Sequence, residues 1–196
     1  ADVVEDGTTF EENALIKASE IAKIAHEMPE YKDMIKAAYD KGHTIGMHTY
    51  SHDYAKVYAS VDAYFQDLDQ IGQMVQEEIG YVPCFIRFPG GSSNTVSKKY
   101  TAGIMSTLVQ EVQNRGYQYY DWNGSSGDGS VRTTEELVAQ ATSFDSNNII
   151  LLCHDSHGKQ TTVEALPQII EHYQSLGYTF KALDRDSFVA HHGVNN

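Results

Sequence analysis

The sequence predicts an α/β fold built around a mostly parallel sheet. Short segments of apolar or aromatic residues, typical of strands buried on both faces, alternate with amphipathic helical stretches. Alternating strands and helices imply parallel strands joined by right-handed crossovers, in either an open sheet or a barrel. Polar residues follow several of the apolar segments, at the strand ends where such folds place their ligand sites.

The predicted elements follow one another along the whole chain. The predicted strands cover residues 43–49, 83–88, 118–122, 148–154 and 178–183. Apolar residues spaced near 3.6 predict helices over residues 10–25, 31–41, 61–79, 104–112 and 163–173. Capping boxes are predicted at Thr8 with Glu11, Thr133 with Glu136, and Thr161 with Glu164.

The composition excludes several functional classes. The chain has 196 residues and a formal net charge of −13, which argues against a nucleic-acid partner because such binding rests on Lys and Arg. Neither an apolar run long enough for a membrane segment nor a secretory signal is expected in it. Cys84 and Cys153 both lie in apolar segments, and we expect free thiols, with one disulfide bridge as the alternative. The oligomeric state is not predicted.

Two histidines leave the first predicted strand. His48 and His52 stand four residues apart, a spacing that lets two imidazoles on one side of a helical turn reach one metal ion. The spacing alone is weak evidence, but the buried strand before it and the other polar strand ends favour a metal site.

The later strand ends carry further candidates. Arg87-Phe88-Pro89-Gly90-Gly91 combines a charge with a turn that brings backbone N–H groups near a ligand, although it is also compatible with a tight loop and a surface arginine. Asp121 adjoins Trp122, whose ring suits either sugar stacking or core packing. His154 leaves an apolar strand, as a general acid or base often does, although a structural histidine is nearly as common there.

In this order the motifs resemble the polysaccharide deacetylases (NodB-homology, carbohydrate esterase family 4). The family's His-Ser/Thr-x-x-His, Arg-x-x-x-Gly, Asp-Trp and Leu-x-His motifs match residues 48–52, 87–91, 121–122 and 152–154. The resemblance covers residues 29–196 and implies a parallel-stranded, NodB-like distorted (β/α) barrel, incomplete at its N-terminal strands. It also implies hydrolysis of N-acetyl groups from N-acetylglucosamine in peptidoglycan or chitooligosaccharide, outside the cell or in its envelope.

The same resemblance implies roles for individual residues. A divalent metal, zinc or cobalt, would be bound by Asp6, His48 and His52. The catalytic residues would be Glu5 as base, His154 as general acid, Arg87 orienting the base, and Asp121 tuning protonation. The residues implied in substrate binding are Pro89, Gly90, Trp122 and Leu152.

The first motif departs from the family pattern. Where the family has Thr-Phe-Asp-Asp-Gly, this chain has Val3-Val4-Glu5-Asp6-Gly7, and no apolar strand separates the next two predicted helices. Residues 1–26 instead resemble a segment of the inosine-triphosphate pyrophosphatases, through Thr9-Phe10 and Asn13-Ala14. We therefore divide the chain into an atypical segment, 1–28, and a deacetylase-like domain, 29–196, with a chimeric origin as one interpretation.

Three functions stay open at this point. The first is an active metal-dependent deacetylase. The second is a catalytically impaired, glycan-binding chimera that lacks a competent base. The third, and the most remote, is a nucleoside-triphosphate pyrophosphatase.

Overall fold

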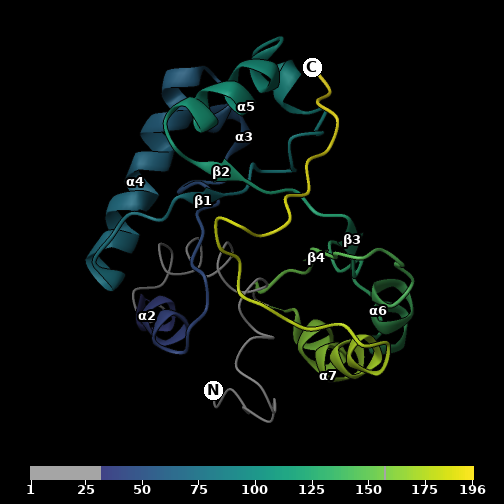
Figure 1. The fold of residues 1–196 in the computed structure, drawn as a ribbon. Coiled ribbons are helices and arrows are strands. Elements are labelled where there is room, and N and C mark those ends of the chain that lie inside the picture. Colours follow the sequence, from purple (N-terminus) through teal and green to yellow (C-terminus); the bar gives the residue numbers. More distant parts are fainter. Residues whose placement is uncertain (1–31, 157) are drawn as a thin grey trace.

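The computed structural model describes residues 32–156 and 158–196, and Figure 1 shows their arrangement. The elements, in chain order, are α2 (Lys32–Asp40), α3 (Tyr54–Val57), α4 (Val61–Ile79), β1 (Phe85–Ile86), the 3-10 turn η2 (Ser97–Lys99), α5 (Ile104–Asn114), β2 (Gln118–Tyr119), β3 (Gly124–Ser125), α6 (Thr134–Ala141), β4 (Leu151–Leu152) and α7 (Gln160–Ser175). The predicted helix over 10–25 and the Thr8–Glu11 capping box lie outside the described residues.

All strand pairing in the described part is parallel, which confirms the predicted α/β fold. β1 pairs with β2, β3 pairs with β4, and Met47 forms an isolated parallel bridge with Ile86. The Met47 amide donates to the Phe85 carbonyl at 2.9 Å, and the Arg87 amide donates to the Met47 carbonyl at 2.9 Å. Three successive strand segments therefore lie side by side and end at one edge.

Two of the predicted strands are corrected by the structure. Of residues 43–49 only Met47 makes a bridge, and residues 178–183 form no strand among the described residues. The side chains of the latter segment are used in packing instead: Tyr178 donates its hydroxyl to the Ser146 carbonyl at 2.7 Å, and Tyr178 and Phe180 pack against the α6–α7 cluster. The backbone of this segment is assigned no strand.

The helices follow the predicted ranges closely, and their ends have identifiable causes. Ser60 caps α4 by accepting a hydrogen bond from the Ala63 amide, and Gly80 ends it with a left-handed φ of 85°. The capping box of Thr133 and Glu136 is present at α6. The box predicted at Thr161 is wrong, because α7 begins at Gln160 and Thr161 lies inside it.

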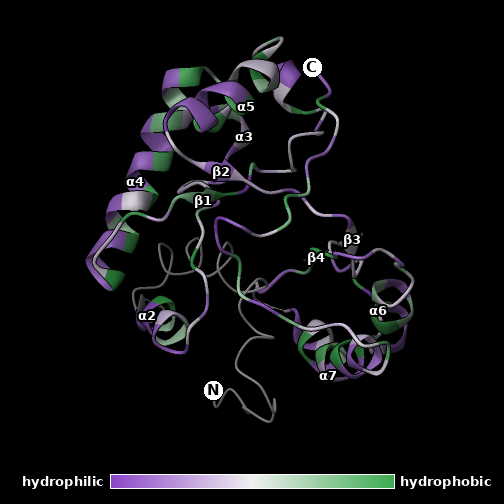
Figure 2. Ribbon diagram, in the orientation of Figure 1, coloured by the Kyte–Doolittle hydropathy of each residue, from purple (hydrophilic) through white to green (hydrophobic). Residues whose placement is uncertain are grey.

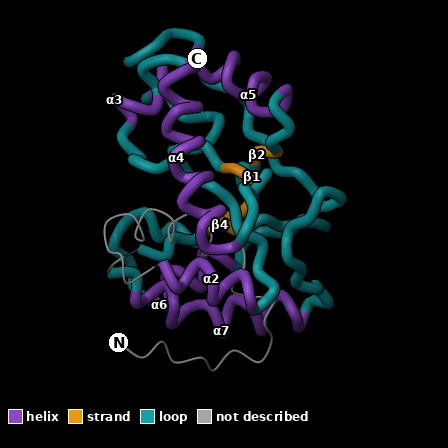
Figure 3. The backbone as a smooth tube through the Cα atoms, turned by 90° about the vertical axis from the view of Figure 1, so that its left-hand side faces the viewer, coloured by secondary structure: helices purple, strands orange, loops and turns teal. Residues whose placement is uncertain are grey.

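The helices bury their apolar faces in two main clusters. Hydrophobic and hydrophilic residues are mixed along α4 in Figure 2. The buried side chains of α4 share one cluster with residues of α2, α5, β1 and β2. α6 and α7 lie beside each other in Figures 1 and 3 and share the second cluster around Leu137 and Ile169. Tyr120, Ile150 and Ala190 form a third, smaller cluster.

Two predictions drawn from composition can be compared with the described residues. Cys84 and Cys153 are both free thiols, as expected. No helix within residues 32–156 and 158–196 combines the length and apolar character needed to cross a membrane.

Truncation of the α4 face tests the larger cluster. Leu68 is completely buried there, so Leu68→Ala is expected to lower the free energy of unfolding by about 2–5 kcal/mol through lost burial and a residual cavity. Urea denaturation followed by circular dichroism measures the change. Val131→Ala, at a fully exposed site, is the control and is expected to shift stability by less than about 0.5 kcal/mol. Equal effects of the two substitutions would contradict the assigned core.

Candidate active site

A pocket of about 210 Å³ opens where the strand segments end. Its lining consists of His48, His52, Tyr54, Arg87, Phe88, Gly90, Trp122, Leu152, Cys153 and His154. These residues come from four separate strand ends, so the parallel pairing described above gathers residues more than 100 positions apart. Of the residues expected to converge, His48, His52, Arg87, Trp122 and His154 line this pocket, and Asp121 is not among its lining residues.

His48 and His52 approach each other through a loop rather than a helical turn. Their ring centroids are 4.9 Å apart, with the ring planes at 56°. Thr49 and His52 both have positive φ, 67° and 49°, so the backbone between the two rings is left-handed at two non-glycine positions. The predicted helical geometry is therefore wrong, while the proximity that it was meant to explain is real.

One hydrogen bond fixes the tautomer of His48. Its Nδ1 lies 2.8 Å from the Arg87 carbonyl oxygen, which can only accept, so Nδ1 carries the proton. Nε2 is left with a free lone pair, the arrangement typical of a metal-binding histidine whose other nitrogen is held by a carbonyl. Burial, followed by the charges of His52 and Arg87, lowers the pKa of His48 to about 3. The ring is neutral, as a ligand must be.

His154 is held by an aspartate that the sequence analysis did not single out. Asp128 is only 2% exposed and accepts from His154 Nδ1 at 2.7 Å and from the His154 backbone amide at 2.6 Å. Thr162 donates to the same carboxylate at 3.0 Å. Burial opposes the charged form of Asp128, but the hydrogen bonds from His154 prevail and lower the pKa of its carboxyl.

Asp121 occupies a different place from the one that its predicted tuning role implies. It is wholly buried and accepts from the Ser92 amide at 2.8 Å, the Ser92 hydroxyl at 2.5 Å and the His192 amide at 2.8 Å. These bonds tie the loop after Arg87 to the C-terminal stretch. Asp128, rather than Asp121, is the carboxylate in contact with the pocket histidine.

The predicted substrate-binding residues divide into those that line the pocket and one that does not. Trp122, Leu152 and Gly90 line it. Pro89 is not among the lining residues, and its carbonyl accepts the Tyr58 hydroxyl at 2.7 Å. Pro89 therefore supports the loop from behind.

The described residues hold two of the three predicted metal ligands. Within that part of the chain no group of three or more His, Cys, Asp or Glu side chains could hold a metal ion. Glu5 and Asp6, predicted as base and third ligand, lie outside the described residues. His48 and His52 supply the donor chemistry of a divalent-metal site that needs at least one more ligand.

Sequence reasoning missed Asp128 and Tyr54. Asp128 stands in the turn Ser126-Gly127-Asp128-Gly129 directly after β3, and this strand was not predicted. A Gly- and Asp-containing turn after a strand end is a usable signal once the strand is known. Tyr54 follows His52 by two residues, and its position on the pocket wall depends on the loop geometry.

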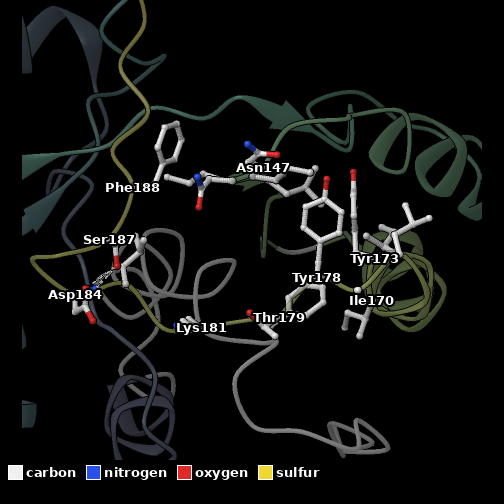
Figure 4. Close-up of a pocket in the computed structure, with 18 of the residues that line it drawn as sticks. Asn147, Ile170, Tyr173, Tyr178, Thr179, Lys181, Asp184, Ser187 and Phe188 are labelled. Carbon is white, nitrogen blue, oxygen red and sulfur yellow. Dashed lines mark hydrogen bonds between the residues drawn. The ribbon is translucent and has the colours of Figure 1, made fainter.

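A larger hollow of about 770 Å³ lies elsewhere and has a different character. It is bordered by α7, residues 147–151 and residues 176–188, and Figure 4 shows Tyr173, Tyr178, Asp184 and Phe188 among its walls. None of the histidines of the smaller pocket lines it. Its size alone does not make it the active site.

The comparisons with known proteins agree with this geometry. The polysaccharide deacetylase family model matches residues 20–120. The catalytic domain of peptidoglycan N-acetylglucosamine deacetylase from Eubacterium rectale has 43% sequence identity and a TM-score of 0.83, covering 87% of this chain and 79% of that one. A Bacillus cereus polysaccharide deacetylase has 26% identity and a TM-score of 0.66, covering 85% of this chain and 78% of the other.

Curated relatives extend the same pattern. A Bacillus cereus peptidoglycan-N-acetylglucosamine deacetylase is 26% identical over 174 residues, 84% of this chain. A chitin deacetylase from Arthroderma benhamiae is 32% identical over 142 residues, 71% of this chain. The chain spans 59% of the length of the first relative and 35% of the second.

The fold and the pocket together define a parallel α/β domain with histidines gathered at its strand ends. The chain belongs to the polysaccharide deacetylase family. The matches lend no support to the resemblance of residues 1–26 to inosine-triphosphate pyrophosphatases, which stays a prediction.

The lowered pKa of His48 makes stability depend on acidity. Between about pH 6.5 and pH 3 the unfolded chain binds a proton at this ring and the folded chain does not, so the free energy of unfolding falls as the pH is lowered through that window. The slope from this one group is at most about 1.4 kcal/mol per pH unit.

Urea denaturation in the presence of a chelator, repeated from pH 7 to pH 4, measures that slope. His48→Asn keeps a donor for the Arg87 carbonyl but does not titrate, so its slope is expected to be shallower by up to one proton. Identical slopes for the two proteins would show that His48 is protonated in the folded state.

Proposed function

We propose that this chain hydrolyses the N-acetyl groups of N-acetylglucosamine residues in a glycan polymer, peptidoglycan or chitooligosaccharide. The observation that carries the proposal is the single pocket lined by His48, His52, Arg87, Trp122 and His154. Membership of the family and the names of the matched relatives support the substrate class.

In this proposal His48 and His52 bind a divalent metal, zinc or cobalt, and Asp6 supplies a third ligand. The bound ion supplies Lewis-acid polarisation of the amide carbonyl and a water of lowered pKa. The neutral, correctly oriented His48 ring fits that task, because its Nε2 lone pair is available and its Nδ1 is engaged.

The remaining residues position groups and move protons. Glu5 takes the proton of the attacking water, and Arg87 orients that base. His154 delivers a proton to the departing sugar amine. Asp128 engages Nδ1 of His154, which leaves Nε2 to reach the substrate and holds the ring in one orientation. Asp121 was predicted to tune protonation. Its hydrogen bonds with Ser92 suit it better to holding the loop that contains Gly90.

Leu152 and Trp122 complete the pocket as apolar and aromatic walls. We assign Leu152 to the acetyl methyl group and Trp122 to the face of the sugar ring. The net charge of −13 suits a neutral or cationic glycan better than a polyanion. Because several relatives are named for peptidoglycan, we place the action of this protein outside the cell or in the cell envelope. We take residues 29–196 as the catalytic domain and 1–28 as an atypical segment.

A second candidate, a glycan-binding protein with impaired catalysis, is favoured by one observation. The described residues hold two of the three proposed metal ligands, and the proposed Glu5 and Asp6 stand where the family has its Asp-Asp pair. Such a protein binds glycan without turnover. Pyrophosphate release from inosine triphosphate is expected from neither candidate.

Acetate release distinguishes the two candidates. Zinc- or cobalt-loaded protein is expected to release acetate from a β-1,4-linked N-acetylglucosamine tetramer, and dipicolinate is expected to abolish the release. His154→Gln is expected to lower kcat by about 100- to 10,000-fold, because the positioned acid is lost. A folded, metal-loaded sample that binds the tetramer but releases no acetate would favour the impaired protein.

Asp128 offers a sharper test of the pocket chemistry. Asp128→Asn retains only one acceptor oxygen for two donors of His154, so kcat is expected to fall by about 10- to 100-fold. Thr162→Val is the matched control, since it removes a donor to the same carboxylate without touching His154. The control is expected to keep kcat near that of the parent. An Asp128→Asn protein with parental kcat would remove Asp128 from the mechanism.

A further inference from the structure

The structure points to a glycan-binding residue that no motif identifies. We propose that Tyr54 forms a second aromatic wall of the pocket, with its hydroxyl bound to the sugar that Trp122 also contacts. This inference rests on the proposed function for its ligand, an N-acetylglucosamine oligomer. It is carried by the position of the Tyr54 ring, by the glycine beneath its hydroxyl, and by the hydrogen bonding of that hydroxyl.

Local structure fixes the ring of Tyr54 at the pocket. Tyr54 opens α3, where the Asp53 side chain caps the helix by accepting from the Ala55 amide at 2.9 Å. The Tyr54 ring lies between those of His52 and Tyr58, with centroids at 5.8 Å and 5.6 Å. A ring held on both sides loses little further freedom when a ligand binds.

The loop beneath the ring is shaped for its hydroxyl. Gly90 has a φ of 75°, and a Cβ at this position would lie 2.6 Å from the Tyr54 hydroxyl oxygen. A side chain at residue 90 would therefore force the Tyr54 hydroxyl away from this position in the pocket wall. At the next residue, Gly91, a Cβ would lie 3.0 Å from the Trp122 ring. Gly90 thus leaves room for Tyr54 beside the loop, and Gly91 leaves room for Trp122.

The hydroxyl of Tyr54 is available to a ligand. Within residues 32–156 and 158–196 it has no hydrogen-bond partner, although the side chain is half-buried. Tyr58, one turn further along, donates its own hydroxyl to the Pro89 carbonyl at 2.7 Å. A half-buried phenol in a pocket wall can donate a hydrogen bond to a ligand and accept one from it.

Sugar chemistry matches what these two walls offer. A pyranose presents apolar C–H faces, which pack on aromatic rings, and equatorial hydroxyl and amide groups at its edge. Trp122 supplies an aromatic surface, and Tyr54 supplies a second surface together with a polar tip. Tyr54 thereby adds affinity and orientation at the sugar ring, whereas His48, His52 and His154 serve the acetyl group.

Binding is measured by calorimetry with a β-1,4-linked N-acetylglucosamine tetramer, in the presence of dipicolinate so that turnover does not consume the ligand. Tyr54→Phe removes only the hydroxyl and is expected to weaken binding by about three- to tenfold. Tyr54→Leu also removes the ring and is expected to weaken it by more than about tenfold. Tyr100→Phe, at an exposed tyrosine outside the pocket, is the matched control and is expected to bind as the parent does.

A double-substitution cycle tests the contact itself. Gly90→Ala is expected to weaken binding by about tenfold in the parent but by no more than about twofold in the Tyr54→Phe protein, where the displaced hydroxyl is already gone. The backbone strain of alanine at a positive φ is present in both backgrounds and cancels in the cycle. Additive effects of the two substitutions would show that residue 90 and Tyr54 act independently.

The outcomes separate this inference from the proposed function. Tetramer binding that depends on Tyr54, without acetate release by the metal-loaded protein, supports the aromatic wall and overturns the activity. Acetate release with unchanged binding and unchanged KM in both Tyr54 variants supports the activity and overturns the wall. A parent protein that does not bind the tetramer, or a Tyr100→Phe loss equal to that of Tyr54→Phe, also overturns it.

Discussion

The hydrogen bond from the His48 ring to the Arg87 carbonyl joins the ends of two neighbouring strand segments at the pocket. It exists because Met47 and β1 exchange backbone hydrogen bonds, which set His48 beside Arg87 at the same edge. The bond assigns the proton to Nδ1, and burial keeps the ring neutral. Placement, tautomer and charge of one candidate ligand therefore follow from strand pairing, and the rest of the pocket is arranged around it.

Local signals were sufficient to predict most of the helices and the pocket rim. The period of apolar residues located α4 from Val61 to Ile79, and the Thr133–Glu136 box located the start of α6. Polar residues at the ends of apolar runs predicted that residues as distant as His48 and His154 meet, which they do. These features depend on short stretches of sequence or on the general behaviour of parallel sheets.

The features that escaped prediction depend on contacts between distant residues. β3 consists of Gly124 and Ser125, which have low strand propensity, and it is defined by its parallel pairing with β4. A Cβ at Gly124 would lie 3.2–3.3 Å from side-chain atoms of Leu151, Phe144 and Ile149, so this position has little room for a side chain. Because β3 was not predicted, the turn that carries Asp128 was not recognised as following a strand end. Asp121, which adjoins Trp122, was therefore predicted as the carboxylate of the site. The proximity of His48 and His52 likewise depends on a left-handed backbone at Thr49. The sequence does not predict this conformation, because a residue other than glycine rarely adopts a positive φ.

The buried carboxylate of Asp121 gives the C-terminal stretch an unexpected importance. Three hydrogen-bond donors satisfy its oxygens, and one of them is the amide of His192, while the His192 ring also contacts the Ser93 hydroxyl and the Trp122 carbonyl. Proteolytic trimming before His192 would leave an oxygen of the buried Asp121 side chain without one of its donors and would remove the contacts of His192 with Ser93 and Trp122. The stretch around His192 therefore holds the pocket loop and the indole in place. An affinity tag fused after it needs a spacer long enough to leave the contacts of His192 intact.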